Sequence, residues 1–215
     1  MALTVQQLED AALADWRKLA RSLHARYRTG DFATGAAFVA AITEAAEAAN
    51  HHPDVRLSYG HVDLELLSHD VGQLTGRDVA LARAISAIAA ARGIAADPGA
   101  VSEIEIALDT AAVGPAGEFW SVLLTGTRES LDGVDVVDRS GRLPLLWFQD
   151  TDDHPTPRQR FHLDLWLPPE VADDRIEAAV AAGGTVVDSS QAPSFVVLAD
   201  PEGNRVCVCT SLDRN

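Results

Sequence analysis

The chain is poor in cysteine and has no long uncharged apolar run. Among its 215 residues, cysteine occurs only at Cys207 and Cys209, two positions apart in a segment with strand character. This spacing excludes an ordinary disulfide framework. The longest alanine-rich stretch is interrupted by Arg83 and Arg92, so no segment offers the roughly 18 apolar residues that a membrane span needs. We expect no membrane-spanning helix.

Positive charge is also scarce. There are 17 Lys+Arg against 32 Asp+Glu, a formal net charge of -15, and Lys18 is the only lysine. The electrostatic field of this net negative charge repels polyphosphates, so we expect no nucleic-acid partner and no anionic membrane partner. The amino end, Met1-Ala-Leu-Thr, lacks the basic region and apolar core of a signal peptide. We therefore expect a reduced, cytoplasmic protein.

The composition that remains is that of a globular protein with room for two domains. Hydrophobic residues make up 47% and the mean hydropathy is +0.02. The best break is Asp97-Pro98-Gly99, because a helix can end at Gly93 and cannot continue through Pro98. We place a linker at about 93–101, between a domain over 1–95 and a domain over 102–215.

The first half has the pattern helix, two strands, helix, two strands, helix. The alternation and capping residues predict the following elements: a helix over 5–16, a hairpin over 18–28, a helix after Asp31, strands over 55–59 and 62–66 joined near Gly60, and a helix after Thr75.

The second half repeats the order strand, helix, strands. The predicted elements are a strand over 104–108, a helix over 115–124 and a strand over 143–148, then a strand over 161–167, a helix over 170–182, and strands over 195–198 and 205–209 around a turn at 200–204. This repetition predicts a paired-module sheet curling around a cavity.

Four of the seven histidines lie within 19 residues, on the predicted hairpin around Gly60. If paired residue numbers add to about 120, His51 faces His69 and His52 faces Ser68 at the open end of the hairpin. Imidazoles close together suit acid–base work, because the free pKa of about 6.5 supplies both forms near neutrality. Two alternatives stay open. The histidines can simply be polar residues at the ends of strands, or they can form a metal site, for which the adjacent His51 and His52 are poorly spaced.

The remaining histidine of this segment is interpreted differently. His61 is in phase with Asp63 and Glu65 on the polar face of its strand, which predicts a solvated or interfacial side chain.

The motifs Asn50-His51-His52-Pro53 and Ser68-His69-Asp70, followed by Asp78-Val79-Ala80-Leu81-Ala82, resemble the pterin-4a-carbinolamine dehydratase family. The resemblance covers about residues 3–92. It implies an α+β fold, a four-stranded antiparallel sheet backed by three helices, and homo-oligomers, either dimers or tetramers. One departure is Val55, where family members often carry tryptophan.

The resemblance also implies an activity that uses no cofactor. The family removes water from 4a-hydroxytetrahydropterin to give quinonoid dihydropterin. When the family's residue roles are carried over by motif, the resemblance implies that His51 and His69 form the acid–base pair and that His52 binds the pterin substrate. The motif residues assigned to substrate binding or imidazole orientation are Asp70, Asp78 and Asn50, with Asp78 equally interpretable as a helix cap.

The second half resembles the glyoxalase and bleomycin-resistance, or vicinal-oxygen-chelate, superfamily. The motifs are Phe119-Trp120, Phe161-His162-Leu163-Asp164 and the segment 198–204, and the resemblance covers about 102–211. It implies two βαβββ modules that form an open barrel. For function it is only weakly specific.

In metal-dependent members the resemblance implies ligands on the first and last strands of each module. Glu105 and His162 match the two first strands, Cys207 stands where the final carboxylate is expected, and Gln149 lies near the fourth position. Because only two expected ligands are present, we predict no catalytic metal, and keep a Glu105, His162 and Cys207 zinc site as the alternative. A metal-free pocket is favoured, walled by Trp120, Trp147, Trp166 and Phe195 if these are not ordinary core.

Three functions are therefore weighed. The first is an active 4a-carbinolamine dehydratase joined to a glyoxalase-like domain of unknown ligand. The second is a small-molecule-binding protein, and the third a regulatory scaffold, in both of which the dehydratase fold only oligomerises. The three histidines His51, His52 and His69 favour the enzyme.

Overall fold

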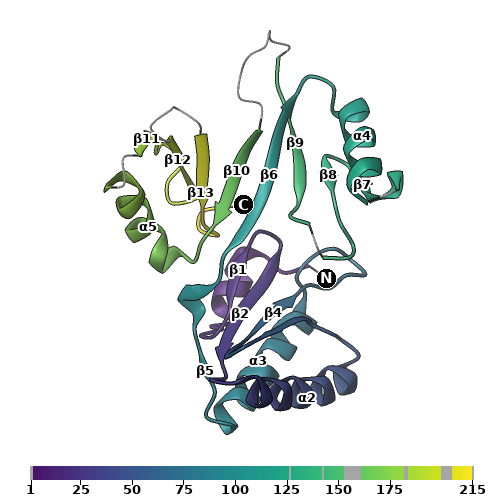
Figure 1. Cartoon of the computed structure of the whole chain (residues 1–215), viewed down its shortest axis with the longest axis vertical. Helices are drawn as coiled ribbons and strands as arrows, with labels where there is room; N and C mark the ends of the chain where they lie inside the picture. The colour runs from purple at the N-terminus through teal and green to yellow at the C-terminus, as the bar shows by residue number, and fades with distance from the viewer. Residues whose placement is uncertain are drawn as a thin grey trace. The chain divides into compact units, whose positions relative to one another are not determined.

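The computed structural model describes residues 2–125, 127–141, 143–152, 161–181, 184–199 and 205–214 (Figure 1). The chain divides into two compact units. Unit 1 comprises residues 1–102 with 167–171 and 211–215, and unit 2 comprises residues 103–166 with 172–210. Each unit has its own sheet and is described by itself.

Unit 1 contains an antiparallel sheet with the strand order β1-β2-β4-β3. These strands are β1 (Arg17–Leu19), β2 (Ser22–Arg28), β3 (Asp54–Ser58) and β4 (His61–Leu66). A two-residue strand, β5 (Ala95–Ala96), pairs with β2 in addition. The four-stranded antiparallel sheet and the hairpin over 18–28 are confirmed.

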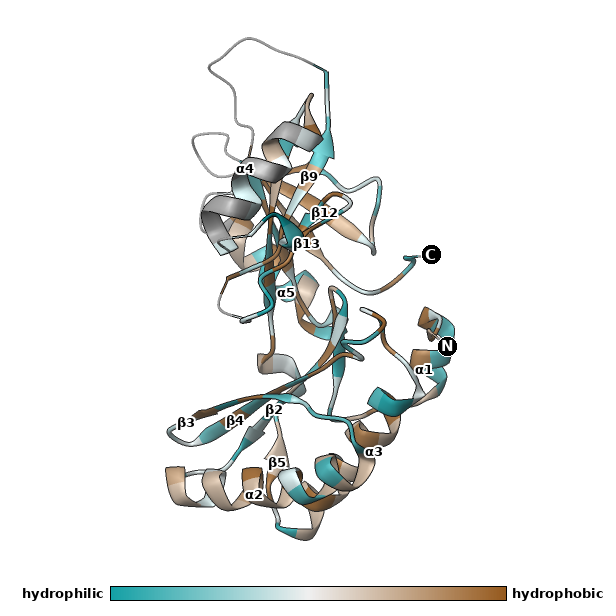
Figure 2. Cartoon of the chain, turned by 90° about the vertical axis from the view of Figure 1, so that its right-hand side faces the viewer, coloured by the Kyte–Doolittle hydropathy of each residue, from teal (hydrophilic) through white to brown (hydrophobic). Residues whose placement is uncertain are grey.

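Three α-helices accompany this sheet, as expected: α1 (Val5–Asp10), α2 (Phe32–Ala49) and α3 (Gly76–Ala91); a 3-10 turn, η1 (Pro98–Ala100), follows. Figure 2 shows α2 and α3 on one face of the sheet. Each helix begins at a side-chain cap: Asp31 accepts from the Thr34 backbone N–H at 2.7 Å, and Thr4 and Thr75 form capping boxes. The predicted helix starts are confirmed.

The core of unit 1 lies between the sheet and the two long helices. Tyr27 on β2 and Phe38 on α2 are both 0% exposed and meet edge to face at 5.2 Å between ring centroids. On β4 the buried residues alternate with half-buried polar ones, as a strand with one covered face requires. His51, His52 and His69 lie just outside these strands, before β3 and after β4, at the open end of the hairpin away from Gly60.

Two local predictions for unit 1 are wrong. The first helix ends at Asp10 instead of residue 16, because Ala12 has φ 50 in the left-handed region. The β3–β4 register is shifted by one residue: Ser58 pairs with His61 across a two-residue loop, so paired numbers add to 119. A two-residue loop has its centre between Tyr59 and Gly60, whereas the predicted register was centred on Gly60.

α2 also has the length and composition of a membrane-spanning helix. Among the described residues it is the one helix that passes this test, with a mean hydropathy of 1.2. One face of α2 packs into the unit 1 core through Gly35, Phe38, Ile42 and Ala46. A core helix of this composition passes the same test without crossing a membrane.

Unit 2 contains one open sheet of eight strands with the order β11-β12-β13-β10-β6-β9-β8-β7. Its first module is β6 (Glu103–Thr110), α4 (Val113–Thr125), η2 (Arg128–Ser130), β7 (Leu131–Asp132), β8 (Asp135–Val136) and β9 (Leu146–Asp150). Its second module is β10 (Phe161–Trp166), α5 (Pro169–Ala181), β11 (Thr185–Asp188), β12 (Phe195–Ala199) and β13 (Arg205–Cys209). The two βαβββ modules are confirmed.

The modules join through antiparallel pairing of their first strands, β6 and β10. The strand predicted over 143–148 is observed at 146–150, and the turn predicted over 200–204 lies outside the described residues. Leu108 and Phe148 face α4 in an apolar cluster, so their neighbours Ala107 and Trp147 face the opposite side. That opposite side carries the polar residues described below.

Candidate functional site

The histidine segment begins where α2 ends. Asn50 caps α2 in the left-handed conformation (φ 44, ψ 44), and the His51 N–H then donates to the Ala46 carbonyl at 3.1 Å. Asparagine tolerates this conformation better than most side chains. The reversal at Asn50 turns His51 back toward the core, where it is 7% exposed.

His51 is held there by the carboxylate of Asp78. The His51 Nε2 atom lies 2.7 Å from Asp78 Oδ1, and Asp78 is 0% exposed. A buried carboxylate is an acceptor, so we assign the hydrogen to Nε2 and leave Nδ1 as the nitrogen that faces away from Asp78. Asp78 is therefore an orienting partner for His51.

Asp78 serves three elements at once. Its second oxygen, Oδ2, accepts the Thr75 N–H at 2.7 Å and the Ser68 hydroxyl at 2.7 Å. Thr75 is the N-cap of α3, and Ser68 lies just beyond β4. Asp78 is therefore both part of the α3 capping box and a hydrogen-bond partner of His51, and one buried carboxylate joins the α2 end, the β4 end and the α3 start.

The other two motif histidines lie at the same end of the hairpin but are exposed. His69 Nε2 is 3.6 Å from Asp54 Oδ2, and His52 Nε2 is 3.0 Å from Glu47 Oε1. β3 begins only at Asp54, and the observed register does not pair His51 with His69. The predicted direct opposition is therefore wrong, although both residues remain at the hairpin end farthest from Gly60.

Asp70 pairs with an arginine of α3. Its carboxylate binds the Arg77 guanidinium, and this hydrogen bond holds the pKa of Asp70 below its ordinary value. Asp70 is thus anchored to α3 beside the histidines. His61, at the other end of β4, lies 3.6 Å from Asp63 on the polar face, in agreement with its predicted environment.

A second polar group lies in unit 2, on the sheet face opposite to α4. Asp164 is paired with Glu105 on one side and with Cys207 on the other, and His162 precedes Asp164 by two residues on the same face. Donor atoms of His162, Asp164 and Cys207 all lie within 4.8 Å of one another. The group combines nitrogen, oxygen and sulfur donors.

This group differs from the ligand set that the sequence suggested. Glu105 accepts a hydrogen bond from Trp166 Nε1 at 2.6 Å and is not one of the three clustered residues. Asp164 was missed, although the alternation of β10 places it two residues after His162 and so on the same face. The sequence contained the necessary signal in the motif Phe161-His162-Leu163-Asp164.

The aromatic residues proposed as pocket walls divide between the two faces. Trp147 meets His162 edge to face at 5.8 Å, and Trp166 lies beyond Asp164 on the same side. Phe195 pairs with Cys209 and shares that side. Trp120, in contrast, is on α4 and packs, partly buried, against the apolar cluster on the other face.

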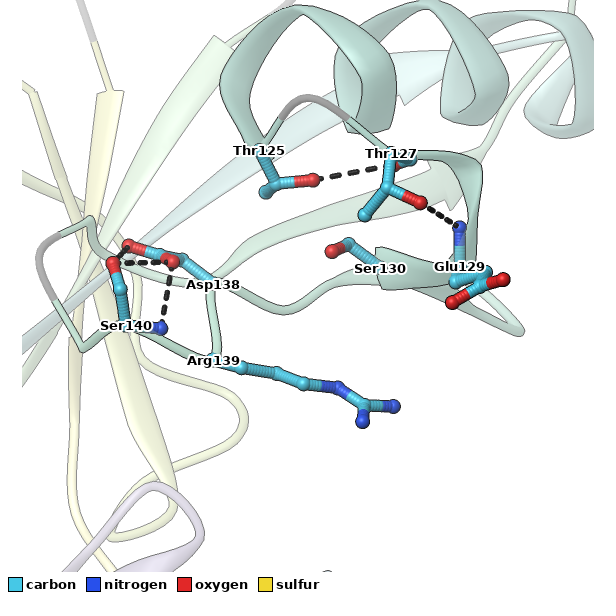
Figure 3. Close-up of a pocket in the computed structure, with 7 residues that line it drawn as sticks. All are labelled: Thr125, Thr127, Glu129, Ser130, Asp138, Arg139 and Ser140. Carbon is cyan, nitrogen blue, oxygen red and sulfur yellow. Dashed lines mark hydrogen bonds between the residues drawn. The ribbon is translucent and has the colours of Figure 1, made fainter.

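A small polar hollow of about 270 Å³ lies elsewhere in unit 2, beside the end of α4 (Figure 3). Asp138 accepts the backbone N–H and the hydroxyl of Ser140, so it closes its own turn, while Arg139 extends away from it. Its lining contains no histidine, and its carboxylates are those of the exposed Glu129 and the half-buried Asp138. It is lined by Thr125, Thr127, Glu129, Ser130, Asp138, Arg139 and Ser140.

The fold of unit 1, with His51, His52 and His69 at the open end of the β3–β4 hairpin, defines a dehydratase-type α+β domain. The fold of unit 2 defines a paired-module βαβββ domain that follows it in the chain. Family models agree with both parts: pterin 4 alpha carbinolamine dehydratase matches residues 1–88, and a glyoxalase-like domain matches residues 105–209. The chain belongs to the pterin-4a-carbinolamine dehydratase family, and it carries a glyoxalase-like domain after the dehydratase domain.

Similar bacterial proteins support this membership. A protein of Koribacter versatilis is 39% identical over 88 residues, which are 40% of this chain and 94% of the relative. A protein of Thermomicrobium roseum is 37% identical over 90 residues, 39% of this chain and 97% of the relative. Both are named pterin-4-alpha-carbinolamine dehydratase, in a form that marks the assignment as provisional.

Two solved structures are similar over the same region. The transcriptional coactivator/pterin dehydratase of Brucella melitensis has 31% identity and a TM-score of 0.40, over 41% of this chain and 99% of that one. A pterin dehydratase-like protein described as a RuBisCO assembly factor has 21% identity and a TM-score of 0.30, over 34% of this chain and 88% of that one.

The left-handed cap at Asn50 leads to a stability prediction. A β-branched residue is strained at positive φ by about 1–2 kcal/mol, so Asn50→Val is expected to lower the free energy of unfolding by that amount. Asn50→Gly, which meets no such strain, is the matched control and is expected to stay close to the wild type. Urea denaturation followed by circular dichroism measures both. Equal stability of Asn50→Val and wild type would show that the left-handed turn is not required.

Proposed function

We propose that the N-terminal domain is an active 4a-hydroxytetrahydropterin dehydratase. The observation that carries this proposal is the buried pair of His51 Nε2 and Asp78 Oδ1 at 2.7 Å, at the hairpin end that also carries His52 and His69. Family membership supports it over the same residues. The proposed substrate is a pterin, and the proposed location is the cytoplasm, which agrees with two cysteines outside any disulfide.

The reaction needs two proton transfers. The C4a–O bond breaks, and the departing hydroxyl takes up one proton to leave as water. The adjacent N5–H loses one proton, and its electron pair forms the C4a=N5 double bond of the quinonoid product. Atoms and charge balance without an oxidant or reductant, so a general acid and a general base are sufficient.

His51 and His69 are the proposed acid–base pair. With Nε2–H donated to Asp78, His51 presents Nδ1 in a fixed orientation for proton transfer. His69, 64% exposed beside Asp54, can exchange its proton with solvent between turnovers. His52, also exposed, is assigned to substrate binding.

The alternative is a binding or scaffold protein in which the dehydratase fold only oligomerises. In that case the buried His51–Asp78 pair would serve stability alone, and removal of the imidazole would change folding without changing any pterin chemistry. A dehydratase assay on the purified full chain distinguishes the two.

The first activity prediction concerns the acid–base pair. His51→Ala and His69→Ala are each expected to lower turnover of 4a-hydroxytetrahydropterin at least about tenfold, because each removes one proton-transfer group. His52→Ala is expected to act mainly on KM. The matched control is His61→Ala, at the far end of the hairpin, with wild-type turnover expected. Full turnover in the His51→Ala, His69→Ala double variant would refute the assignment.

The second activity prediction concerns Asp78. Asp78→Asn is expected to lower kcat at least about tenfold, because the carboxylate that orients His51 is lost. It is also expected to lower the free energy of unfolding by about 1–3 kcal/mol, since buried donors lose a charged acceptor. Asp31→Asn is the control for loss of a helix-capping carboxylate, because Asp31 is the N-cap residue of α2 and accepts from Thr34 instead of from a histidine. Steady-state kinetics and urea denaturation check both; unchanged kcat in Asp78→Asn would contradict the orienting role.

We also propose that the chain forms a homo-oligomer through unit 1. β3 is an edge strand of the sheet and Val55 on it is 39% exposed, while Phe32 at the start of α2 is 53% exposed. Open edges and exposed apolar side chains of this kind are usually covered by a partner.

Sedimentation velocity at micromolar concentration tests this proposal. The expected species has two or four times the 22.9 kDa mass of the chain. A single 22.9 kDa species over the whole concentration range would overturn it.

A further inference from the structure

The polar group on the unit 2 sheet is built by strand geometry. His162 and Asp164 are alternate residues of β10, so they project on the same face. β13 runs parallel to β10 with Cys207 directly beside Asp164. The sheet pairing thus brings an imidazole, a carboxylate and a thiol to one point, and all three donor atoms lie within 4.8 Å of one another.

These distances suit a small cation. Four tetrahedral ligands at zinc bond lengths of about 2.0–2.3 Å place their donor atoms roughly 3.3–3.6 Å apart. His162 Nε2 and Asp164 Oδ1 are already 3.5 Å apart. The remaining separations are at most 4.8 Å and would close by up to roughly 1.5 Å to reach this range.

The surroundings of His162 fit a metal ligand as well. Its second nitrogen, Nδ1, lies 3.7 Å from Asp109 Oδ1, and its side chain is 18% exposed. Histidine ligands commonly donate the N–H that does not face the metal to a carboxylate, which orients the ring. Trp147 packs edge to face against the same ring and limits its rotation.

We propose that His162, Asp164 and Cys207 bind a zinc ion in the glyoxalase-like domain. Nitrogen, oxygen and thiolate ligands together suit zinc better than magnesium or calcium, which prefer oxygen alone. Binding exchanges the Cys207 thiol proton for a metal–sulfur bond, and the proton is released to solvent. Three protein ligands leave one tetrahedral position for water or a bound small molecule.

This set differs from the one implied by the superfamily resemblance. All three ligands belong to the second module, on β10 and β13, whereas the resemblance implies ligands from both modules. Glu105, the expected ligand of the first module, accepts from Trp166 Nε1 instead. The expectation of no catalytic metal rested on a count of two ligands, and Asp164 raises that count to three.

Cobalt(II) titration of the full chain, stripped of metal by a chelator, tests the proposal. We expect about one equivalent of cobalt to bind, with the near-ultraviolet absorption of a thiolate-to-cobalt charge transfer and displacement by zinc. Cys207→Ser is expected to abolish this absorption. His162→Ala and Asp164→Asn are expected to weaken cobalt binding at least about tenfold.

Cys209→Ser is the matched control. Cys209 is the other thiol of the same strand but is not in the clustered group, so its variant is expected to keep the charge-transfer absorption. Failure of the wild type to bind cobalt or zinc at micromolar concentration would overturn the proposal. So would an absorption that persists in Cys207→Ser and disappears in Cys209→Ser.

A second measurement does not depend on a folded variant. Iodoacetamide alkylation of the wild type, mapped by mass spectrometry, is expected to modify Cys207 in the stripped protein and to be slowed at least tenfold by one equivalent of zinc, roughly the size of effect expected for a metal-bound thiolate. Alkylation of Cys207 at an unchanged rate with zinc would count against the site.

Discussion

The buried carboxylate of Asp78 is the interaction on which the N-terminal site depends. A carboxylate with 0% exposure is stable only if its oxygens are well bonded, and Asp78 binds His51 through one oxygen and Thr75 and Ser68 through the other. Because these partners come from the end of α2, the start of α3 and the segment after β4, a single group holds three chain segments in place. A helix-capping carboxylate is thereby also the group that orients His51, which we propose as an acid–base residue.

In the glyoxalase-like domain, strand pairing brings the polar side chains together. There the pleat of the sheet separates an apolar face, covered by α4, from a polar face that carries His162, Asp164 and Cys207. Each of these groups lies within a single unit of the chain. The two parts of the chain can therefore be tested with separate variants of the full-length protein.

Much of this architecture could be predicted because it depends on short-range patterns. The capping boxes at Thr4 and Thr75, the Asp31 cap and both βαβββ modules follow from residues close together in the chain. The end of the first helix could not be predicted, because its residues continue a helical pattern and only the backbone at Ala12 interrupts it. The predicted hairpin register differs from the observed one by one residue for a similar reason. A two-residue loop and a loop centred on Gly60 both fit the same alternation of apolar and polar residues.

The sequence by itself determined the family, the α+β class and which histidines belong to the motif, because these depend on residue identity and spacing. Tertiary structure alone decided the partners. It separated a buried His51 from exposed His52 and His69, assigned Asp70 to Arg77, and set Asp164 beside Cys207. The physical reason is that burial and pairing depend on contacts between segments distant in the chain: His51 and Asp78 are 27 residues apart, and Asp164 and Cys207 lie on strands joined through a helix and two further strands.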